Sequence, residues 1–207
     1  ASMRLMRAMG VPQMDAATRA DGRQEMRLHP STYRMATIGG FLAGGSGGVG
    51  SIRWGGLRNL GNVIRLRMVT MEAEPRILDL SGEDVLKVLH AYGTNGIITE
   101  VEIPLTAAPD WVDVVVGFDD WLDAVRFGEE IGKADGLLVK EIGPVAAPVA
   151  HDYFAKHQRF IRREQSVVLL MVADFAMSGF EAFMKGRRGE VLYRADTATP
   201  EEKRGLP

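Results

Sequence analysis

The densest cluster of glycines in the chain lies between Gly44 and Gly50, where five of seven residues are glycine. Each glycine within a regular helix or strand costs roughly 0.5–1 kcal/mol relative to alanine, because more backbone freedom is lost on folding. Such a density is tolerated where the backbone needs positive φ angles, or where its N–H groups must approach a ligand. Apolar residues such as Ile38, Leu42 and Ile52 flank the cluster, so we expect a structured loop rather than a flexible linker. A tight turn without a ligand stays open as the simpler interpretation.

The composition is that of an ordinary globular protein. The chain has 207 residues, 46% of them hydrophobic and 25% charged, which is enough for one large domain or two small ones. Its formal net charge of -2 gives no general affinity for nucleic acid or anionic lipid, so no nucleic-acid partner is expected. The chain contains no cysteine, which excludes disulfides and thiolate chemistry and fits a reducing, cytoplasmic setting. Its apolar runs are too short to span a membrane.

Hydrophobic periodicity predicts two dissimilar halves, with a boundary at residues 106–110. In the first half we expect short helices, then the glycine segment, then strands that alternate apolar and polar residues. The expected helices cover 3–10, 15–21 and 82–91, the last of them capped by Ser81, and the expected strands cover 62–71, 75–80 and 97–105.

The second half repeats strands and helices in alternation. The expected strands cover 111–118, 136–142, 167–174 and 190–195, and the expected helices cover 119–131, 149–161 and 178–185, with Asp119 and Ser178 as caps. Apart from the helix at 149–161, this order is βαβ followed by βαβ, which is typical of a ferredoxin-like domain. In the helix at 119–131 we expect Trp121, Leu122, Val125 and Ile131 to face inward, and we expect 197–207 to form a loose tail.

The glycine segment matches two phosphate-binding patterns only in part. Gly45 to Ser51 resembles a P-loop, but no lysine follows Gly50, so the main cation of such a loop is missing. The three glycines of a GxGxxG pattern are also present, at positions 45, 47 and 50. That pattern needs a helix directly after it, and further glycines at 55, 56 and 61 argue against a clean helix there. Neither interpretation is favoured.

A third interpretation comes from a family resemblance. The segments that carry it are Ala36-Thr37-Ile38-Gly39-Gly40-Phe41-Leu42-Ala43, Gly47-Gly48, Arg53-Trp54-Gly55 and Asn62-Val63, followed at matching spacing by Gly93-Thr94-Asn95-Gly96-Ile97-Ile98-Thr99-Glu100. Together they resemble the flavoproteins of the vanillyl-alcohol oxidase family, which have a PCMH-type FAD-binding fold. Within that family the chain is most similar to the FAD-linked glycolate oxidase and D-lactate dehydrogenase branch. The resemblance covers roughly residues 28–135, and the rest more faintly.

The resemblance implies an α+β fold, in which the second subdomain of a PCMH-type FAD-binding fold precedes a ferredoxin-like cap domain. The implied division is an N-terminal segment over 1–32, an FAD-binding subdomain over 33–108, a cap or substrate domain over 109–196 and a tail over 197–207. In this family, backbone N–H groups of glycine turns neutralise the FAD pyrophosphate. The implied contacts to the ribityl chain, pyrophosphate and flavin edge are Thr37, Gly39, Gly40, Gly44, Ser46, Gly47 and Gly48. Gly96 and Ile98 would contact the adenosine half, although Ile98 is equally explained as a core residue.

The implied function is an FAD-dependent oxidoreductase that oxidises a 2-hydroxy acid or similar alcohol by hydride transfer to flavin, with the cofactor performing the chemistry. By the same comparison the chain is a fragment that lacks the N-terminal FAD subdomain and the C-terminal catalytic region. We therefore expect weak or absent FAD binding, and we name no catalytic residue. The alternative is a non-catalytic module that completes its site with another chain, as a homodimer or with a complementing subunit.

The remaining polar residues predict no second site. The four histidines are scattered, and His151 and His157 stand on different sides of the expected helix, so no zinc site is predicted. Arg159, Arg162 and Arg163 are expected to form a solvent-facing helix edge. Tyr92, next to the second glycine turn, is a candidate for a cofactor contact.

Overall fold

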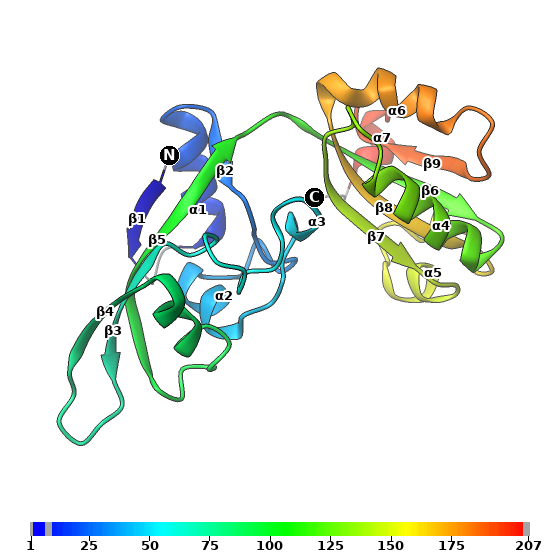
Figure 1. Ribbon diagram of the computed structural model, residues 1–207. Coiled ribbons are helices and arrows are strands. Elements are labelled where there is room, and N and C mark those ends of the chain that lie inside the picture. The colour runs from blue at the N-terminus through cyan, green and yellow to red at the C-terminus, as the bar shows by residue number, and fades with distance from the viewer. Residues whose placement is uncertain (1, 7–9, 205–207) are drawn as a thin grey trace. The chain divides into compact units, whose positions relative to one another are not determined.

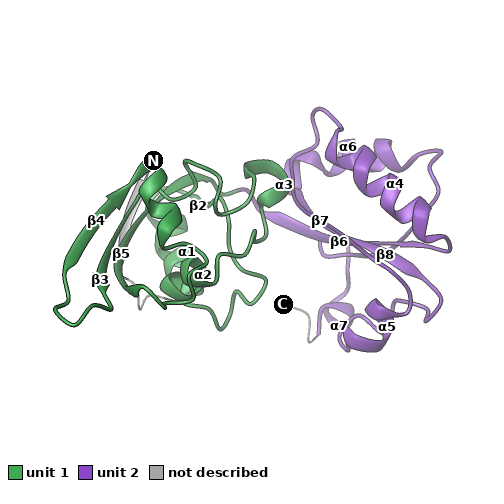
Figure 2. Ribbon diagram, turned by 60° about the horizontal axis from the view of Figure 1, so that its bottom comes forward, with its two compact units in different colours: residues 1–108 green, residues 109–207 purple. Residues whose placement is uncertain are grey.

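The computed structural model describes residues 2–6 and 10–204, and Figure 1 shows their helices and strands. The chain divides into two compact units, Ala1–Ala108 and Pro109–Pro207, coloured separately in Figure 2. The division falls between β5 (Gly96–Ala107) and β6 (Trp111–Phe118). Within the described residues, no helix combines the length and the apolar character that crossing a membrane requires.

Unit 1 is built on an antiparallel sheet with the strand order β1-β5-β3-β4. Its strands are β1 (Ser2–Met6), β3 (Arg65–Thr70), β4 (Ile77–Ser81) and the long β5, whose far end also pairs with β2 (Gln24–Met26). Leu66, Met68 and Thr70 of β3 are buried and alternate with more exposed residues. This period of two gives the sheet one apolar face and one charged face.

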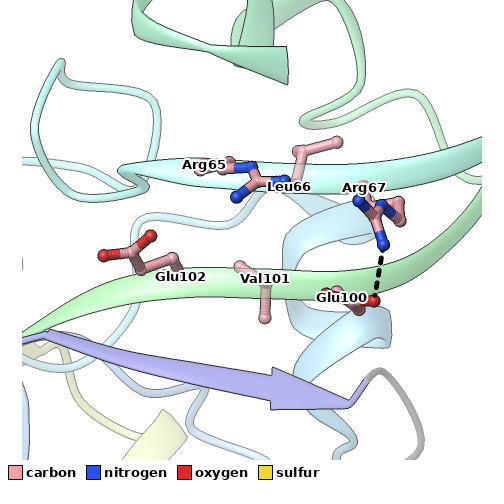
Figure 3. Close-up of a pocket in the computed structure, with 6 residues that line it drawn as sticks. All are labelled: Arg65, Leu66, Arg67, Glu100, Val101 and Glu102. Atoms are coloured by element: carbon pink, nitrogen blue, oxygen red, sulfur yellow. Dashed lines mark hydrogen bonds and ion pairs between the residues drawn. The ribbon is translucent and has the colours of Figure 1, made fainter. Parts of the chain in front are cut away.

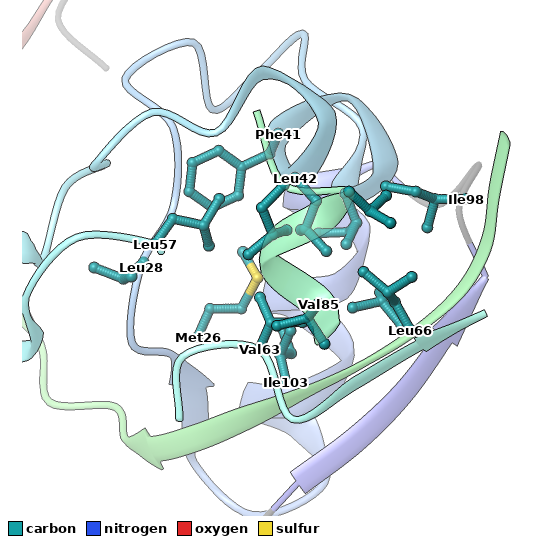
Figure 4. Close-up of a cluster of buried hydrophobic side chains, with 14 of the residues drawn as sticks. Met26, Leu28, Phe41, Leu42, Leu57, Val63, Leu66, Val85, Ile98 and Ile103 are labelled. Carbon is teal, nitrogen blue, oxygen red and sulfur yellow. The ribbon is translucent and has the colours of Figure 1, made fainter. Parts of the chain in front are cut away.

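The helices of unit 1 are α1 (Val11–Ala20), α2 (Ile38–Gly44), the short α3 (Ser51–Trp54) and the 3₁₀ helix η1 (Gly82–Lys87). Their apolar residues form one core with the buried face of the sheet, part of which is drawn in Figure 4. Leu42 of α2, Val85 of η1 and Leu66 of β3 are each at most 2% exposed in this core. The core therefore fixes α2, which contains the first half of the glycine segment, against the sheet.

Two predictions for unit 1 are wrong. The expected helix over 3–10 is a strand over its first residues, because Ser2–Met6 pairs antiparallel with β5; residues 7–9 lie outside the described part of the chain. The alternation of arginine with methionine and leucine there has the period of a strand. The expected helix over 82–91 is only the 3₁₀ helix η1, which starts at Gly82 with φ of +58° and has no side-chain cap from Ser81. The turn expected at 15–21 is part of the longer helix α1.

Unit 2 has a four-stranded antiparallel sheet with the order β7-β8-β6-β9. Its elements after β6 are α4 (Trp121–Gly132), β7 (Val139–Val145), α5 (Val149–Tyr153), β8 (Ser166–Ala173), η2 (Asp174–Ala176), α6 (Met177–Met184), β9 (Glu190–Arg194) and α7 (Pro200–Lys203). Because β8 lies between β6 and β7, the strand–helix–strand unit is split in the ferredoxin-like manner. The ferredoxin-like prediction is confirmed.

Both faces of this sheet are covered. Phe127 of α4 and Phe180 of α6 pack with Val168 of β8 on one face. On the other face Val115 and Tyr193 form a smaller cluster, against which Phe160 packs. The second cluster includes residues from the segment between β7 and β8. The insertion that we predicted as a helix therefore covers the second face of the sheet.

The ends and faces of the helices in unit 2 differ from the predictions. Asp120 rather than Asp119 caps α4, by accepting a hydrogen bond from the Asp123 backbone N–H at 3.1 Å. The inward stripe is Ala124, Phe127, Gly128 and Ile131, whereas Trp121, Leu122 and Val125 are 38%, 54% and 37% exposed. The prediction is therefore right only for Ile131, because the helix packs the face that carries Ala124, Phe127 and Gly128 against the sheet.

Three further boundaries in unit 2 differ. The helix expected over 149–161 is only α5, and α6 follows η2 directly without a side-chain cap from Ser178. The tail contains the short helix α7. A capping box, in which Thr199 and Glu202 exchange hydrogen bonds, starts this helix. Local capping therefore orders part of a segment that we expected to be loose.

Candidate functional site

The glycine segment begins with a helix and only then becomes a turn. Thr37 is the N-cap of α2, and its Oγ1 accepts a hydrogen bond from the Gly40 N–H at 3.1 Å. Gly45 ends the helix in the left-handed conformation with φ of +66°, and its N–H donates to the Phe41 carbonyl at 2.9 Å. The loop prediction is wrong for 38–44, where Gly39 is buried within the helix, and right for 45–50.

Three glycines of this segment are required by contacts within the chain. Gly45, Gly48 and Gly50 all have positive φ. A Cβ on Gly45 would lie 2.4 Å from the Cβ of His90. On Gly48 or Gly50 it would lie 2.8 Å from the His29 carbonyl oxygen or 2.1 Å from that of Arg27. These glycines allow neighbouring backbone segments to pack closely.

Two other glycines, Gly44 and Gly47, are not required by packing or by a positive φ. A Cβ on Gly44 would meet nothing within 4 Å, and on Gly47 its nearest contact would be the Ser51 Cβ at 3.8 Å. Neither residue has a left-handed φ. Because neither packing nor conformation among the described residues demands glycine here, the absence of side chains leaves the backbone open to a ligand.

The turn also carries unpaired donors. Among the described residues, the backbone N–H groups of Ser46, Gly47 and Gly48 donate no hydrogen bond to the chain. Pairing resumes at Val49, whose N–H donates to the His29 carbonyl at 2.8 Å. Ser46 and Gly47 are exposed. Backbone N–H groups are obligatory donors, and consecutive free ones form an anion-binding surface.

The residues just before the second sequence motif contact the end of α2, next to this turn. The backbone N–H of His90 donates to the Leu42 carbonyl at 3.3 Å, and that of Tyr92 donates to the Ala43 carbonyl at 3.0 Å. The His90 imidazole donates from Nδ1 to the Gly44 carbonyl at 2.6 Å. The segment that directly precedes the second motif is therefore in contact with the end of α2.

Gly96 and Ile98 lie in the sheet. A Cβ on Gly96 would meet the Met68 Cε at 2.1 Å and the Val69 carbonyl oxygen at 2.4 Å. Ile98 is 4% exposed and belongs to the core of unit 1. The structure gives both residues a packing role, which for Ile98 is the alternative that the sequence left open.

The Arg53-Trp54-Gly55 motif and Asn62 form a second turn against the first. The Asn62 Nδ2 donates to the Trp54 carbonyl at 2.9 Å and to the Gly56 carbonyl at 3.0 Å. A Cβ on Gly56 would lie 4.0 Å from the Cα of Gly47. Asn62 therefore fixes a turn that lies next to Gly47.

Positive charge accumulates at this second turn. The guanidinium groups of Arg27 and Arg53 lie 4.4 and 5.8 Å from the centroid of the Trp54 ring. Neither arginine forms an ion pair with any residue that the structure describes, and the buried Nε of Arg27 has no hydrogen-bond partner there. Sequence reasoning missed Arg27, because nothing in its neighbourhood marks it as different from other surface arginines.

The charged face of the unit 1 sheet is a network of ion pairs. A small pocket there is lined by Arg65, Leu66, Arg67, Glu100, Val101 and Glu102, and Figure 3 shows the pair between Arg67 and Glu100. Arg67 also pairs with Asp79 at 2.9 Å. Hydrogen bonds from Arg67 and Arg65 hold the pKa of the Asp79 carboxyl well below its usual range. The mutual neutralisation indicates a structural face.

Two arginines of the basic cluster in unit 2 form ion pairs, and the third is held by a hydrogen bond to the backbone. Arg162 pairs with Asp119 at 2.8 Å, and Arg163 pairs with Asp152 at 3.0 Å. Arg159 donates to the backbone carbonyl of Glu202. Within residues 2–6 and 10–204, no group of three or more possible metal-binding side chains is found.

Comparison with known proteins gives a fold and no sequence family. No protein-family model matches the chain, and no curated protein matches it. Solved structures of alkyldihydroxyacetonephosphate synthase in two crystal forms match with TM-scores of 0.69, at 18% and 19% identity. The matches cover 94% and 98% of this chain but only 40% and 41% of those chains. The chain thus spans about two-fifths of their length.

This structural similarity confirms the predicted fold class. Unit 1 and unit 2 together have the α+β fold expected for the second subdomain of a PCMH-type FAD-binding fold followed by a ferredoxin-like domain. At this level of identity, the similarity concerns the fold alone.

Proposed function

We propose that this chain is part of an FAD-dependent oxidoreductase and that residues 44–48 hold the FAD pyrophosphate. The observation that carries the proposal is the row of free N–H groups at Ser46, Gly47 and Gly48. A pyrophosphate carries negative charge and many acceptor oxygens, so it matches consecutive backbone donors. The fold similarity supports the same cofactor.

The residues around the turn fit this cofactor. Gly44 and Gly47 present backbone without a side chain on their open sides. Arg27 and Arg53 supply positive charge that no described carboxylate neutralises. A charge-assisted hydrogen bond from the backbone or a guanidinium to a phosphate oxygen is about twice as strong as a neutral one.

Each residue of the site then has a limited role. Ser46, Gly47 and Gly48 donate to the phosphate oxygens, and Thr37 maintains the start of α2 through its cap. When bound, FAD supplies the two-electron acceptor, which the protein's own side chains lack. The chain contributes binding, charge compensation and orientation.

The substrate class that we propose, a 2-hydroxy acid or related alcohol, rests on the resemblance of the sequence motifs to the glycolate and D-lactate enzymes. A cytoplasmic location rests likewise on the lack of cysteine. The structurally similar proteins carry a different name, alkyldihydroxyacetonephosphate synthase. Dye reduction by a panel of 2-hydroxy acids, with simple alcohols as comparison, tests the substrate class.

The second candidate is a non-catalytic module that completes its site with another chain. Met35, Ile52 and Leu60 of unit 1 are 85%, 53% and 60% exposed, and large exposed apolar side chains favour association. This candidate predicts a stable homodimer or a complex with a complementing subunit, and no dye reduction. Sedimentation analysis and the dye assay separate the two candidates.

The decisive experiment is a titration of the chain with FAD, followed by flavin fluorescence. Gly44→Ala and Gly47→Ala place a methyl group on the open backbone without a clash. We expect each to weaken FAD binding about tenfold or more, because charged hydrogen bonds of about 1.5–3 kcal/mol are lost.

Gly22→Ala is the matched control, since its Cβ would meet only the Gln24 Cγ at 3.9 Å. It should leave both the affinity and the melting temperature unchanged. Because this chain is expected to bind FAD weakly, the titration runs to FAD concentrations at which binding is measurable, and unchanged affinity in Gly47→Ala would contradict the proposal.

A further inference from the structure

His90 has an unusual backbone conformation and also contacts the glycine turn. Its φ is +67°, and the only other non-glycine residues with positive φ in the described chain are Arg23 and Tyr92. A non-glycine residue in this region is strained, and such strain persists where the surroundings require it. His90 is thus held in place by the structure around it.

His90 contacts the C-terminal end of α2. A helix leaves its last carbonyl groups without partners inside the helix. In the common Schellman ending, the N–H that follows the left-handed glycine bonds back to one of these carbonyls. Here that N–H belongs to Ser46, and it makes no such bond among the described residues.

The carbonyls of α2 receive donors from another segment instead. The Leu42 and Ala43 carbonyls accept from the backbone N–H groups of His90 and Tyr92. The Gly44 carbonyl accepts from the His90 side chain at 2.6 Å. In a Schellman ending the Gly45 N–H would bond to the Leu42 carbonyl and the Ser46 N–H to the Phe41 carbonyl. Because His90 occupies the Leu42 carbonyl, the Gly45 N–H bonds to the Phe41 carbonyl at 2.9 Å instead, and the Ser46 N–H stays available.

We propose that His90 is a positioning residue that keeps the N–H groups of residues 46–48 free for an anionic phosphate ligand. The inference rests on the proposed function for the identity of the ligand, and on the contacts of His90 for its mechanism. Nδ1 must carry the hydrogen, since the Gly44 carbonyl only accepts. The backbone of His90 also packs closely against Gly45, so the turn cannot move toward His90.

The side chains of His90 and Tyr92 differ in this respect. The Tyr92 ring is 70% exposed, and its ring centroid lies 4.9 Å from that of His90. No hydrogen bond of the Tyr92 side chain is found in the described chain. Tyr92 therefore shares the strained backbone but not the contact to Gly44, which makes it the natural control.

The test compares three variants. His90→Ala removes the donor and keeps a side chain in the left-handed conformation. His90→Asn keeps an amide donor and tolerates that conformation well. Tyr92→Asn relieves the same backbone strain without touching Gly44. For each, the order of the amides at 44–48 is measured by ¹⁵N relaxation, and the affinity for FAD is measured beside that for riboflavin, which lacks phosphate.

We expect His90→Ala to lower the order of these amides and to weaken FAD about tenfold, with no change for riboflavin. His90→Asn should restore both properties, and Tyr92→Asn should alter neither. If His90→Ala does not fold, the comparison of His90→Asn with a His90→Gly variant, which lacks the donor but suits the backbone, decides the question.

The outcomes separate the two proposals. Wild-type amide order and FAD affinity in His90→Ala would overturn the role of His90. Unchanged FAD affinity in Gly47→Ala, together with disordered amides in His90→Ala, would overturn the proposed function and leave the positioning role standing. Equal weakening of FAD and riboflavin would also overturn the inference, since the effect would not depend on phosphate.

Discussion

Gly45 and His90 are in a backbone contact that only glycine permits, since a Cβ on Gly45 would lie 2.4 Å from the Cβ of His90 and 2.8 Å from its backbone nitrogen. Gly45 lies in the glycine segment, and His90 lies just before the second sequence motif at 93–100. Their contact joins the end of α2 to the segment before β5. The turn at 45–48 is therefore shaped by a tertiary contact as well as by its glycines.

Gly45→Ala should be markedly destabilising. The left-handed backbone costs about 1–2 kcal/mol for a residue with a side chain, and the overlap with His90 adds about 1–3 kcal/mol. Gly82→Ala is a matched control, because Gly82 has a similar φ of +58° and nothing within 4 Å of its Cβ position. Urea unfolding measures both variants. Equal losses of unfolding free energy would mean that the contact with His90 contributes nothing.

Asn62→Ala should lower the free energy of unfolding by about 1–3 kcal/mol, because a buried carbonyl loses its donor. Asn62 is 6% exposed, and the Trp54 carbonyl accepts from its amide. Asn62→Asp keeps the shape but only accepts hydrogen bonds, so it should be at least as harmful. The exposed Asn59→Ala should change stability by less than about 0.5 kcal/mol. An Asn62→Asp variant as stable as the wild type would show that the amide of Asn62 does not fix the turn.

Asp113 and Glu141 should make unit 2 less stable as the pH rises. They lie on β6 and β7, each paired across the sheet with Met171 of β8. Burial raises the pKa of both carboxyl groups, and the charge of Asp113 further raises that of Glu141. A carboxyl whose pKa is higher in the folded state binds more protons there, so stability falls as pH rises from the ordinary pKa through the raised one.

Asp113→Asn should therefore stabilise the protein near pH 7, because the amide has no charged form whose burial is unfavourable. The gain should vanish below about pH 3, where both the folded and unfolded states are protonated. Urea midpoints at the two pH values measure the difference, and Asp135→Asn controls for removing an exposed carboxylate. A gain that is the same at both pH values would show that charge is not its cause.

Tyr33 should link stability to alkaline pH. Its hydroxyl donates to the Asp15 carboxylate at 3.1 Å. Burial first, and then the charge of Asp15, raises the pKa of Tyr33 from 10.0 to about 12. This contribution is complete below pH 10, where the unfolded phenol is still neutral, and is lost as the pH rises toward 12. Tyr33→Phe should remove this part of the alkaline stability loss, and an unchanged pH profile would refute the link.

The sequence was a good guide to the strands and a poor guide to helix ends. Trp111–Phe118 is a strand with the predicted bounds. A run of β-branched residues strongly favours a strand over a helix. The helix α4 was predicted in place, yet its inward face was misassigned. A helix of mixed apolar residues does not reveal which side packs, and here Gly128 allows the sheet to approach.

The candidate site was predictable as a segment but not as an arrangement. The glycine density marks the turn at 44–50, and the motif spacing marks 93–100. Nothing in the sequence distinguishes Gly44 and Gly47, which are open, from Gly45 and Gly50, which are packed. Arg27 and His90 were also out of reach, since their importance arises from contacts with Trp54 and Gly44.

The sequence by itself determined the two-part α+β architecture, the register of apolar residues in the strands and the place of the glycine turn. These follow from local periodicity and from the conformational freedom of glycine. Only the tertiary structure decided which N–H groups of the turn stay free, because that depends on whether residues 90–92 satisfy the end of α2. Hydrogen-bond partners distant in the chain are not encoded by any local pattern, and they distinguish a turn open to a ligand from one closed on itself.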